Sequence, residues 1–328
     1  MSKMTIKNLP DAALVAIRAL FDYEYLEQNH KMYYQELGYR DYEPNAADEQ
    51  GNALSGPQKG VLTVEEQEYG DNTNFRGYPV AVNLRKYTSK LTLSEEQVHW
   101  LSVNDKKISE VKDLVRGHIN ALIGNVNLDA CKMYYLGFGT TFAKIGDGLS
   151  LFNKAHTIRA NANTYANTFP TGDTHRAFGD QALIDSINFM DRFVAMSGEE
   201  MRLCSKIRII CAKELAPTVW KTIKSLYGPN NANMGMSAAS EEALKSRGVS
   251  IDYFVAEDIP YAYRNYWFLV DLERAKDMLL MDWGWKPRLN DQWEYRNGSS
   301  FNLGSVFFGP RALSWQFAFG SKGDTSAI

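Results

Sequence analysis

Apolar residues recur at helical spacing in two segments of the chain. From residue 108 onward they follow one another at steps of three and four positions, in the order Ile108, Val111, Val115, Ile119, Leu122, Val126, Ala130 and Met133. This spacing predicts a long amphipathic helix, and some thirty residues would span about 45 Å. Gly117 and Gly124 would weaken the helix locally and allow a bend. A second stripe predicts a helix over residues 9–28, with Leu14, Ile17, Leu20 and Phe21 on one face.

Alternating apolar and polar residues predict a long β-hairpin over residues 60–93. One strand begins with Val61–Val64, a polar tip lies around residues 69–74, and the return strand alternates from Val80 to Leu93. About sixteen residues a side, at roughly 3.3 Å each, give a reach of about 50 Å. Because an isolated two-stranded ribbon is only marginally stable in water, we expect this one to lie on a partner surface. The alternative is a hairpin folded back on its own domain.

The segment between the predicted helix at 9–28 and the predicted hairpin at 60–93 is polar and rich in tyrosine. From residue 27 to about residue 60, Tyr33, Tyr34, Tyr39 and Tyr42 stand among Gly, Asn, Asp and Pro, and no domain-sized hydrophobic pattern is present. This composition indicates an extended arm. Tyrosine suits a contact surface because its ring has an apolar body and a polar tip.

Shorter elements are predicted along the rest of the chain. Residues 137–180 are rich in Gly, Asn, Thr and Ala and indicate a loop with one short strand at Leu149–Phe152. Helices are predicted at 180–197, at 214–227 and in a short segment ending at Gly248, and strands at 206–211, 250–256, 266–271 and 278–283. The tail over residues 301–319 is predicted to be β, with an alternating set formed by Trp315, Phe317 and Phe319.

The composition is that of a folded protein with no strong electrostatic bias. The chain has 328 residues, 45% of them hydrophobic and 23% charged, and a net charge of −3. This balance argues against a concentrated basic face for gripping nucleic acid, although it does not exclude a protein that encloses nucleic acid. Three cysteines without metal or redox spacing indicate buried free thiols. No apolar stretch approaches 18 residues, so we expect no membrane partner.

The motifs of common enzymes and cofactor sites are incomplete in this sequence. Gly137–Phe142 begins like a dinucleotide loop but lacks the third glycine and follows a predicted helix. The five histidines are scattered, and Gly235–Ala239 fails at the last position of a nucleophile elbow. We therefore predict no catalytic residue, cofactor or metal, and interpret Glu65, Glu66 and Glu68 as solvated or inter-subunit charges.

Four passages in a fixed order resemble one family. Leu151–His156 with Thr164–Asn167 is similar to the LFN-x-x-H…TYSN segment of the head subunits of Mu-type phages. Lys206–Ile210, Asp252–Asp271 and Pro310–Ser321 resemble later passages of the same family. The chain therefore resembles the major capsid proteins of tailed bacteriophages, which share the fold named for phage Hong Kong 97. It departs from them in the longer, more charged segment over residues 272–287.

The resemblance implies an α+β, HK97-like capsid fold with an N-terminal arm, an extended β-hairpin loop, a peripheral domain with a long spine helix, and an axial α/β domain. The implied boundaries are 1–59 for the arm, 60–93 for the extended loop, 94–200 and 286–328 for the peripheral domain, and 201–285 for the axial domain. Contacts between subunits are expected at Glu65, Glu66, Glu68, Tyr69, Asn72, Phe75, Arg76 and Tyr78.

The resemblance also implies a function. The chain would be a structural subunit that assembles into pentamers and hexamers and encloses double-stranded DNA in an icosahedral head. Its partners would be copies of itself, a portal protein, a separate scaffolding protein and, where the phage has one, a decoration protein. It would be made in the host cytoplasm and end in the virion. The alternatives are an encapsulin-like nanocompartment shell protein and an unrecognised α/β enzyme.

Overall fold

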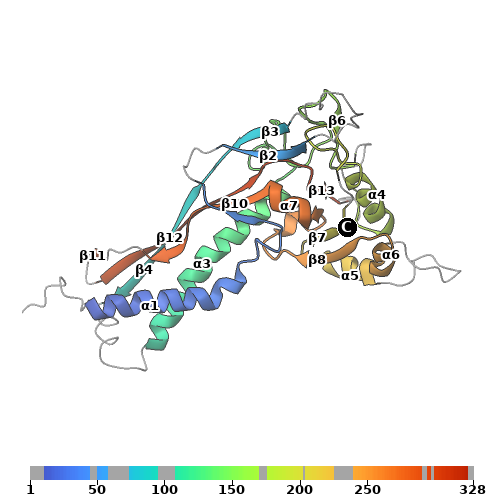
Figure 1. Ribbon diagram of the computed structural model, residues 1–328. Helices are drawn as coiled ribbons and strands as arrows, with labels where there is room; N and C mark the ends of the chain where they lie inside the picture. Colours follow the sequence, from blue (N-terminus) through green and yellow to red (C-terminus); the bar gives the residue numbers. More distant parts are fainter. Residues whose placement is uncertain are drawn as a thin grey trace, which may run out of the picture.

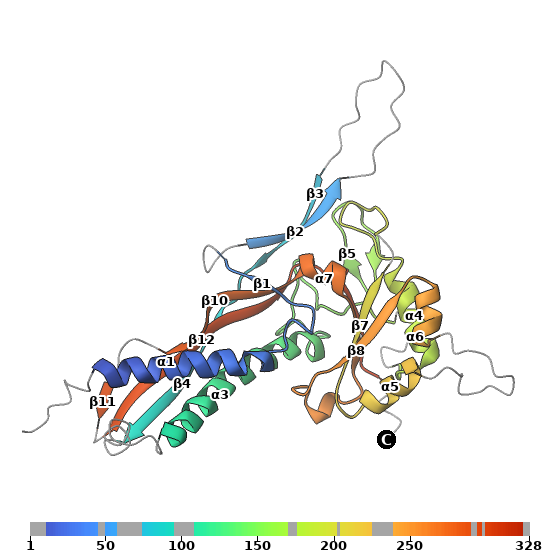
Figure 2. The ribbon, with the colours of Figure 1, turned by 60° about the horizontal axis from the view of Figure 1, so that its bottom comes forward.

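The computed structural model describes residues 11–44, 50–57, 74–94, 108–169, 176–201, 204–224, 239–289, 294–296 and 299–323. These residues form two bodies that lie side by side (Figure 1). One body contains the two long helices and a five-stranded sheet, and the other is built on a four-stranded sheet with short helices around it. A two-stranded ribbon leaves the molecule beside them (Figure 2).

The first body is organised around helix α3 (Ile108–Tyr135), which confirms the long helix predicted from the sequence. Its apolar face is buried, as predicted, at Val111, Val115, Ile119 and Leu122, and the helix continues through both glycines. The helix packs on β4 (Arg85–Ser94) and β12 (Ser299–Ala312). The sheet order is β1-β10-β12-β11, with β4 also paired to β12; the remaining strands are β1 (Arg40–Tyr42), β10 (Leu279–Leu289) and β11 (Glu294–Arg296).

Helix α1 (Asp11–Gln28) lies against α3. Ile17 and Phe21 are buried between the helices, in agreement with the predicted apolar stripe. Glu24 is also fully buried there. Its charge is compensated by Lys112 and Arg116 of α3, which lie 3.1 and 2.9 Å from its carboxylate. A short 3-10 helix η2 (Asn29–Lys31) ends this element.

The second body is a mixed sheet in the order β13-β9-β7-β8. The parallel pair β7 (Lys206–Cys211) and β8 (Ser250–Val255) is connected through α5 (Ala216–Lys224) and α6 (Glu241–Ser246), while β9 (Trp267–Asp271) and β13 (Ala318–Ser321) are antiparallel neighbours. The other elements of this region are α4 (Asp180–Met190), η4 (Tyr261–Tyr263), α7 (Leu272–Met278), β5 (His156–Thr157) and β6 (Thr164–Tyr165).

The ribbon differs from the predicted hairpin at both ends. Its strands are β2 (Gln50–Pro57) and β3 (Asn74–Ala81), paired in antiparallel register with Gly51 opposite Val80. The incoming strand therefore lies where we predicted the arm, and Val61–Val64 lies outside the described residues. The return strand also stops early, because β4 leaves the ribbon and pairs with β12. Alternation shows that one face of a strand is buried, but it does not identify the strand's neighbour.

Several smaller predictions were wrong. Leu149–Phe152 forms no strand, only an isolated bridge at Ser150, and α4 ends at Met190 instead of 197. The tail is not a single one-sided strand either. Most of it is β as predicted, in β12 up to Ala312 and in β13 from Ala318, but Ser314 and Gln316 are as buried as Trp315, Phe317 and Phe319. Packing on both sides has replaced the expected alternation of buried and exposed positions.

The chain passes between the two sheets twice near the C-terminus. After β9 of the four-stranded sheet, β10 begins at Leu279 in the five-stranded sheet, and after β12 the chain returns to the four-stranded sheet as β13. The boundaries of the peripheral and axial domains stay a prediction. None of the helices in the described ranges has the length and apolarity that crossing a bilayer requires.

Candidate assembly surface

The three cysteines lie in the core. Cys131, Cys204 and Cys211 are buried free thiols, and burial raises the pKa of Cys131 and of Cys211 to about 12. They therefore stay protonated and are poor nucleophiles. Among the described residues, no group of three or more His, Cys, Asp or Glu side chains could hold a metal ion. The features that stand out are instead the root of the ribbon and the surfaces beside it.

Tyr78 of β3 fixes the ribbon to the body at its root. Its hydroxyl lies 3.3 Å from Thr157 Oγ1, and the guanidinium of Arg159 lies 5.2 Å from the centre of its ring. On its other side Gly146 is so close that a Cβ there would be 2.6 Å from the Cβ of Tyr78. We call Gly146, Thr157 and Arg159 the ribbon seat. Only a glycine fits at position 146 against this strand.

A buried ion pair supports the next residues of the same strand. Arg311 of β12 donates to the carbonyl of Val80 at 3.2 Å and to the carboxylate of Asp282 at 2.8 Å. Both charged side chains are almost inaccessible to solvent, with 3% and 0% exposed. Where the strand bends after the ribbon, Gly309 of β12 passes so close to Asn83 that a Cβ would lie 2.2 Å from the Asn83 carbonyl oxygen.

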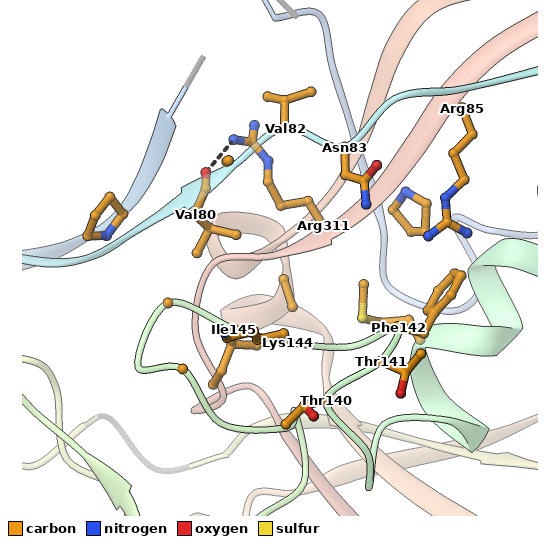
Figure 3. Close-up of a pocket in the computed structure, with 17 residues that line it drawn as sticks. Val80, Val82, Asn83, Arg85, Thr140, Thr141, Phe142, Lys144, Ile145 and Arg311 are labelled. Atoms are coloured by element: carbon orange, nitrogen blue, oxygen red, sulfur yellow. Dashed lines mark hydrogen bonds between the residues drawn. The ribbon is translucent and has the colours of Figure 1, made fainter. Parts of the chain in front are cut away.

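A pocket of about 630 Å³ lies between the ribbon root, the loop that follows α3 and the end of β12 (Figure 3). Three cations, Arg85, Lys144 and Arg311, contribute to its lining, which contains no acidic residue and no histidine. Arg311 is paired with Asp282, and Arg85 lies 3.8 Å from Asp129. The charged lining of the pocket is therefore entirely cationic.

The structure describes only part of the set of residues predicted to contact other subunits. Glu65, Glu66, Glu68, Tyr69 and Asn72 lie outside the described residues. Phe75 and Arg76 lie in β3, and Tyr78 packs on its own chain, as described above. The inter-subunit role of this set stays a prediction. The expectation that the whole ribbon would lack support from its own chain was wrong at the root, because Tyr78 and Val80 are anchored to the body.

The tyrosines of the predicted arm also pack on their own chain. The segment over residues 31–41, which we call the tyrosine strap, crosses α3. The Tyr33 backbone N–H donates to Asn127 Oδ1 at 3.1 Å, and Tyr39 donates to the Ala130 carbonyl at 2.9 Å. The Tyr33 hydroxyl donates to Asp258, which follows β8. Burial raises the pKa of Tyr33 far above its usual value, so this hydroxyl keeps its proton.

The tyrosine strap connects both sheets to α3, the predicted spine helix. Arg208 of β7 makes two hydrogen bonds to Asp252, at 2.9 and 2.7 Å, and donates to the backbone carbonyl of Glu36 at 2.9 Å. At the other end of the strap, Asp41 accepts a hydrogen bond from Trp283 of β10 at 2.9 Å. The sequence showed where Tyr33 and Tyr39 were but not that their partners lie on their own chain, because those partners are 91 to 225 residues away.

Two large hydrophobic side chains are exposed on the second body. Trp220 of α5 is 55% exposed and Tyr261 of η4 is 65% exposed. The Arg264 guanidinium stacks over the Tyr261 ring at 4.2 Å. Tryptophan, tyrosine and arginine are enriched in protein–protein interfaces.

Comparison with known proteins identifies the fold. No model of a known protein family and no curated protein sequence matches the chain. Among solved structures it is similar to the capsid of a native GTA particle, with a TM-score of 0.50 and 12% identity over 90% of this chain and 91% of the other. It is equally similar to a chain of Mycobacterium phage Patience, with a TM-score of 0.50 and 12% identity over 93% and 86% of the two chains.

The chain therefore has the α+β fold of the HK97-like capsid proteins. The likeness extends over about 90% of both chains in the GTA comparison, so it includes both bodies. At 12% identity the shared feature is the fold. A shared fold does not by itself define a function, because the function resides in the surfaces and sites that the fold presents.

Proposed function

We propose that this chain is the major capsid protein of a tailed bacteriophage, a structural subunit with no enzymatic role. Copies associate into pentamers and hexamers and close into an icosahedral head that encloses double-stranded DNA. Contacts of this kind are head-to-tail, and such contacts close into rings when the rotation between neighbours permits. Each subunit touches several neighbours, so a modest affinity at any one contact is sufficient.

The observation that carries the proposal is the ribbon on a capsid fold. Each ribbon strand has eight described residues, a length of about 26 Å at 3.3 Å per residue. The ribbon rises from the body as a separate two-stranded sheet (Figure 2). Two strands alone are marginal in water. A surface on a neighbouring copy would stabilise the ribbon beyond its anchored root.

The expected partners follow from this role. They are other copies of the chain, a portal protein, a separate scaffolding protein and a decoration protein where the phage has one. The net charge of −3 suits a wall that encloses DNA without binding it tightly. The protein would be made in the cytoplasm of the host and located in the capsid of the virion.

The test shortens the ribbon and leaves its root intact. Residues 54–76, which include the outer part of both ribbon strands, are replaced by a two-residue Asn-Gly turn, so that Tyr78 and Val80 keep their contacts. We expect the wild-type chain to form hollow particles of uniform diameter in electron micrographs. The shortened chain should stay soluble as monomers or capsomers, with a near-normal circular dichroism spectrum. Closed particles from the shortened chain would show that the ribbon is not required.

The micrographs, together with the protein and DNA content of native particles, discriminate the alternatives. Discrete small oligomers and no shells from the wild-type chain would contradict the capsid role and favour an enzyme. Shells that co-purify with one cargo protein from the native source, and contain no DNA, would favour a nanocompartment. Shells of native particles that contain DNA would support the phage head.

A further inference from the structure

The passage that resembles the LFN-x-x-H…TYSN segment folds around one buried histidine. The side chain of His156 is 0% exposed, and that of its partner Asp147 is 1% exposed. His156 Nδ1 lies 2.7 Å from Asp147 Oδ2. The imidazole stacks on Trp315, with ring centres 4.9 Å apart and 7° between the planes. This cluster connects the loop after α3 to the C-terminal segment.

The hydrogen-bond network fixes where protons lie in this cluster. Asn167 Nδ2 donates to the carbonyls of Leu151 and Ala318, at 2.8 and 3.2 Å, and its Oδ1 accepts the Asn153 N–H at 2.9 Å. His156 Nε2 therefore faces two acceptors, Asn167 Oδ1 at 3.1 Å and the Leu151 carbonyl at 3.2 Å. An imidazole nitrogen that meets only acceptors must carry a proton.

A second proton lies between the histidine and the carboxylate. Asp147 Oδ1 accepts the backbone N–H of Leu149 at 2.9 Å, which leaves Oδ2 for His156 Nδ1. At 2.7 Å, a bare nitrogen lone pair facing an ionised carboxylate would be repulsive, so a proton is shared within the pair. The two groups are thus held together by a charge-assisted hydrogen bond in a buried site, which is among the stronger polar contacts in proteins.

The Asp147–His156 pair lies directly beside the ribbon seat. Gly146 precedes Asp147 in the chain and Thr157 follows His156. These two neighbours are the residues that meet Tyr78, Gly146 by close approach and Thr157 through its hydroxyl. Drawing Asp147 and His156 together therefore holds the two sides of the seat at a fixed separation around the tyrosine.

We propose that Asp147 and His156 are positioning residues that set the direction of the ribbon by holding the ribbon seat on Tyr78. The bracing is a property of the single subunit. Its consequence for shell formation rests on the function proposed above. Both residues act through their chain neighbours Gly146 and Thr157, which meet Tyr78.

Hydrogen exchange of the soluble subunit tests the bracing. Asp147→Asn and His156→Gln should each speed amide exchange in β2, β3 and residues 144–158 by about tenfold or more, because these amides open locally once the seat loosens. Amides of β7 and β9 should exchange at wild-type rates. Nitrogen NMR of the imidazole in the wild-type subunit should show a protonated Nε2 on His156, since that nitrogen faces two acceptors.

Asp271→Asn is the matched control. Asp271 is a 3%-exposed carboxylate that lies 3.2 Å from Arg274, and it accepts the backbone N–H two residues onward at 2.9 Å, as Asp147 does. It belongs to β9, in the other sheet. This variant should speed exchange around α7 and β9 and leave the ribbon unchanged. Should either cluster variant fail to fold, Thr157→Val removes only the hydroxyl at Tyr78 and should still speed exchange at the ribbon root by about threefold.

The outcomes separate the two proposals. One outcome is that the ribbon strands of both cluster variants exchange at wild-type rates while the global stability is lowered. That result would show that the pair only stabilises the core, and it would overturn the inference. The same holds for the Thr157→Val variant if the root does not loosen. Faster ribbon exchange combined with normal shells would leave the bracing in place and count against the ribbon's role in assembly.

Discussion

Single residues decide how the ribbon joins the body, and the clearest case is the pair formed by Arg311 and Asp282. The pair lies beneath the strand that carries Val80, and both side chains are shielded from solvent. Charges in such a place are costly to desolvate, and they are tolerated because each neutralises the other. Removing one partner therefore leaves an uncompensated charge in the core.

We predict that Arg311→Met destabilises the soluble subunit by about 3–5 kcal/mol, because it strands the buried Asp282 carboxylate. Replacing both residues, as in Arg311→Met with Asp282→Leu, should recover most of this loss. Urea unfolding followed by circular dichroism measures both variants. Equal stability of the single and the double variant would show that the charge at Asp282 is not the cause.

Two carboxylates tie the N-terminal elements to the body. Burial raises the pKa of Glu24, but hydrogen bonds from Arg116 and Lys112 outweigh this, so its pKa is lowered from 4.5. Burial likewise opposes the hydrogen bonds of Tyr34 and Trp283 at Asp41, whose net pKa is lowered from 3.8. The folded state therefore holds these protons less tightly than the unfolded state, and this stabilisation is lost as the pH falls.

We predict that α1 loosens before the rest of the subunit as the pH falls below 4.5, and the tyrosine strap as it falls below 3.8, because the stabilisation by each carboxylate is complete only above its unfolded pKa. Amide exchange of α1, compared with that of α3, measures the effect. Glu24→Gln should loosen α1 already at pH 7 and flatten its pH dependence. Simultaneous loss of protection in α1 and α3 in the wild type would contradict a separate step.

The spine helix, α3, continues through Gly117 and Gly124, although these glycines were expected to weaken it. A Cβ added at Gly117 or Gly124 would meet nothing within 4 Å. We predict that Gly117→Ala and Gly124→Ala each stabilise the soluble subunit by about 0.5–1 kcal/mol, because alanine loses less backbone entropy in a helix. Thermal unfolding measures the change. Gly309→Ala is the opposing control, since its Cβ would collide with the Asn83 backbone.

Strand β4 shows the limit of prediction at the element scale. Its residues alternate in exposure as predicted, with Tyr87 and Ser89 half-buried and Lys86 and Thr88 exposed. The sequence pattern therefore indicated the strand and its buried face. It could not indicate that the ribbon ends at Ala81 and that β4 pairs with β12, more than 200 residues away. Partner choice depends on tertiary packing.

At the scale of the whole molecule, the exposed aromatic residues Trp220 and Tyr261 remain on the surface of the folded subunit. If the proposed function holds, they lie in the body expected to meet its copies around the symmetry axes. We predict that Trp220→Ala and Tyr261→Ala lower the yield of shells about tenfold while changing subunit stability by less than about 0.5 kcal/mol. Lys221→Ala, on the same helix, should change neither. Shell yield by electron microscopy and unfolding of the subunit measure the two effects.

Local patterns in the sequence were sufficient to predict part of the fold. The two long helices, strand β7 and the cluster residues His156 and Asn167 were all marked by periodicity or by a motif. Each depends on side chains within a few turns or strands of one another, where spacing along the chain translates directly into a shared face.

The tertiary structure alone decided which distant segments meet. The tyrosine strap packs on its own α3, and β13 pairs with β9 in the four-stranded sheet. These contacts join residues whose separation in sequence carries no signal, and they form because burying a polar group requires a hydrogen-bond partner from whichever segment packs against it. Periodicity specifies a buried face, and only packing specifies what covers it.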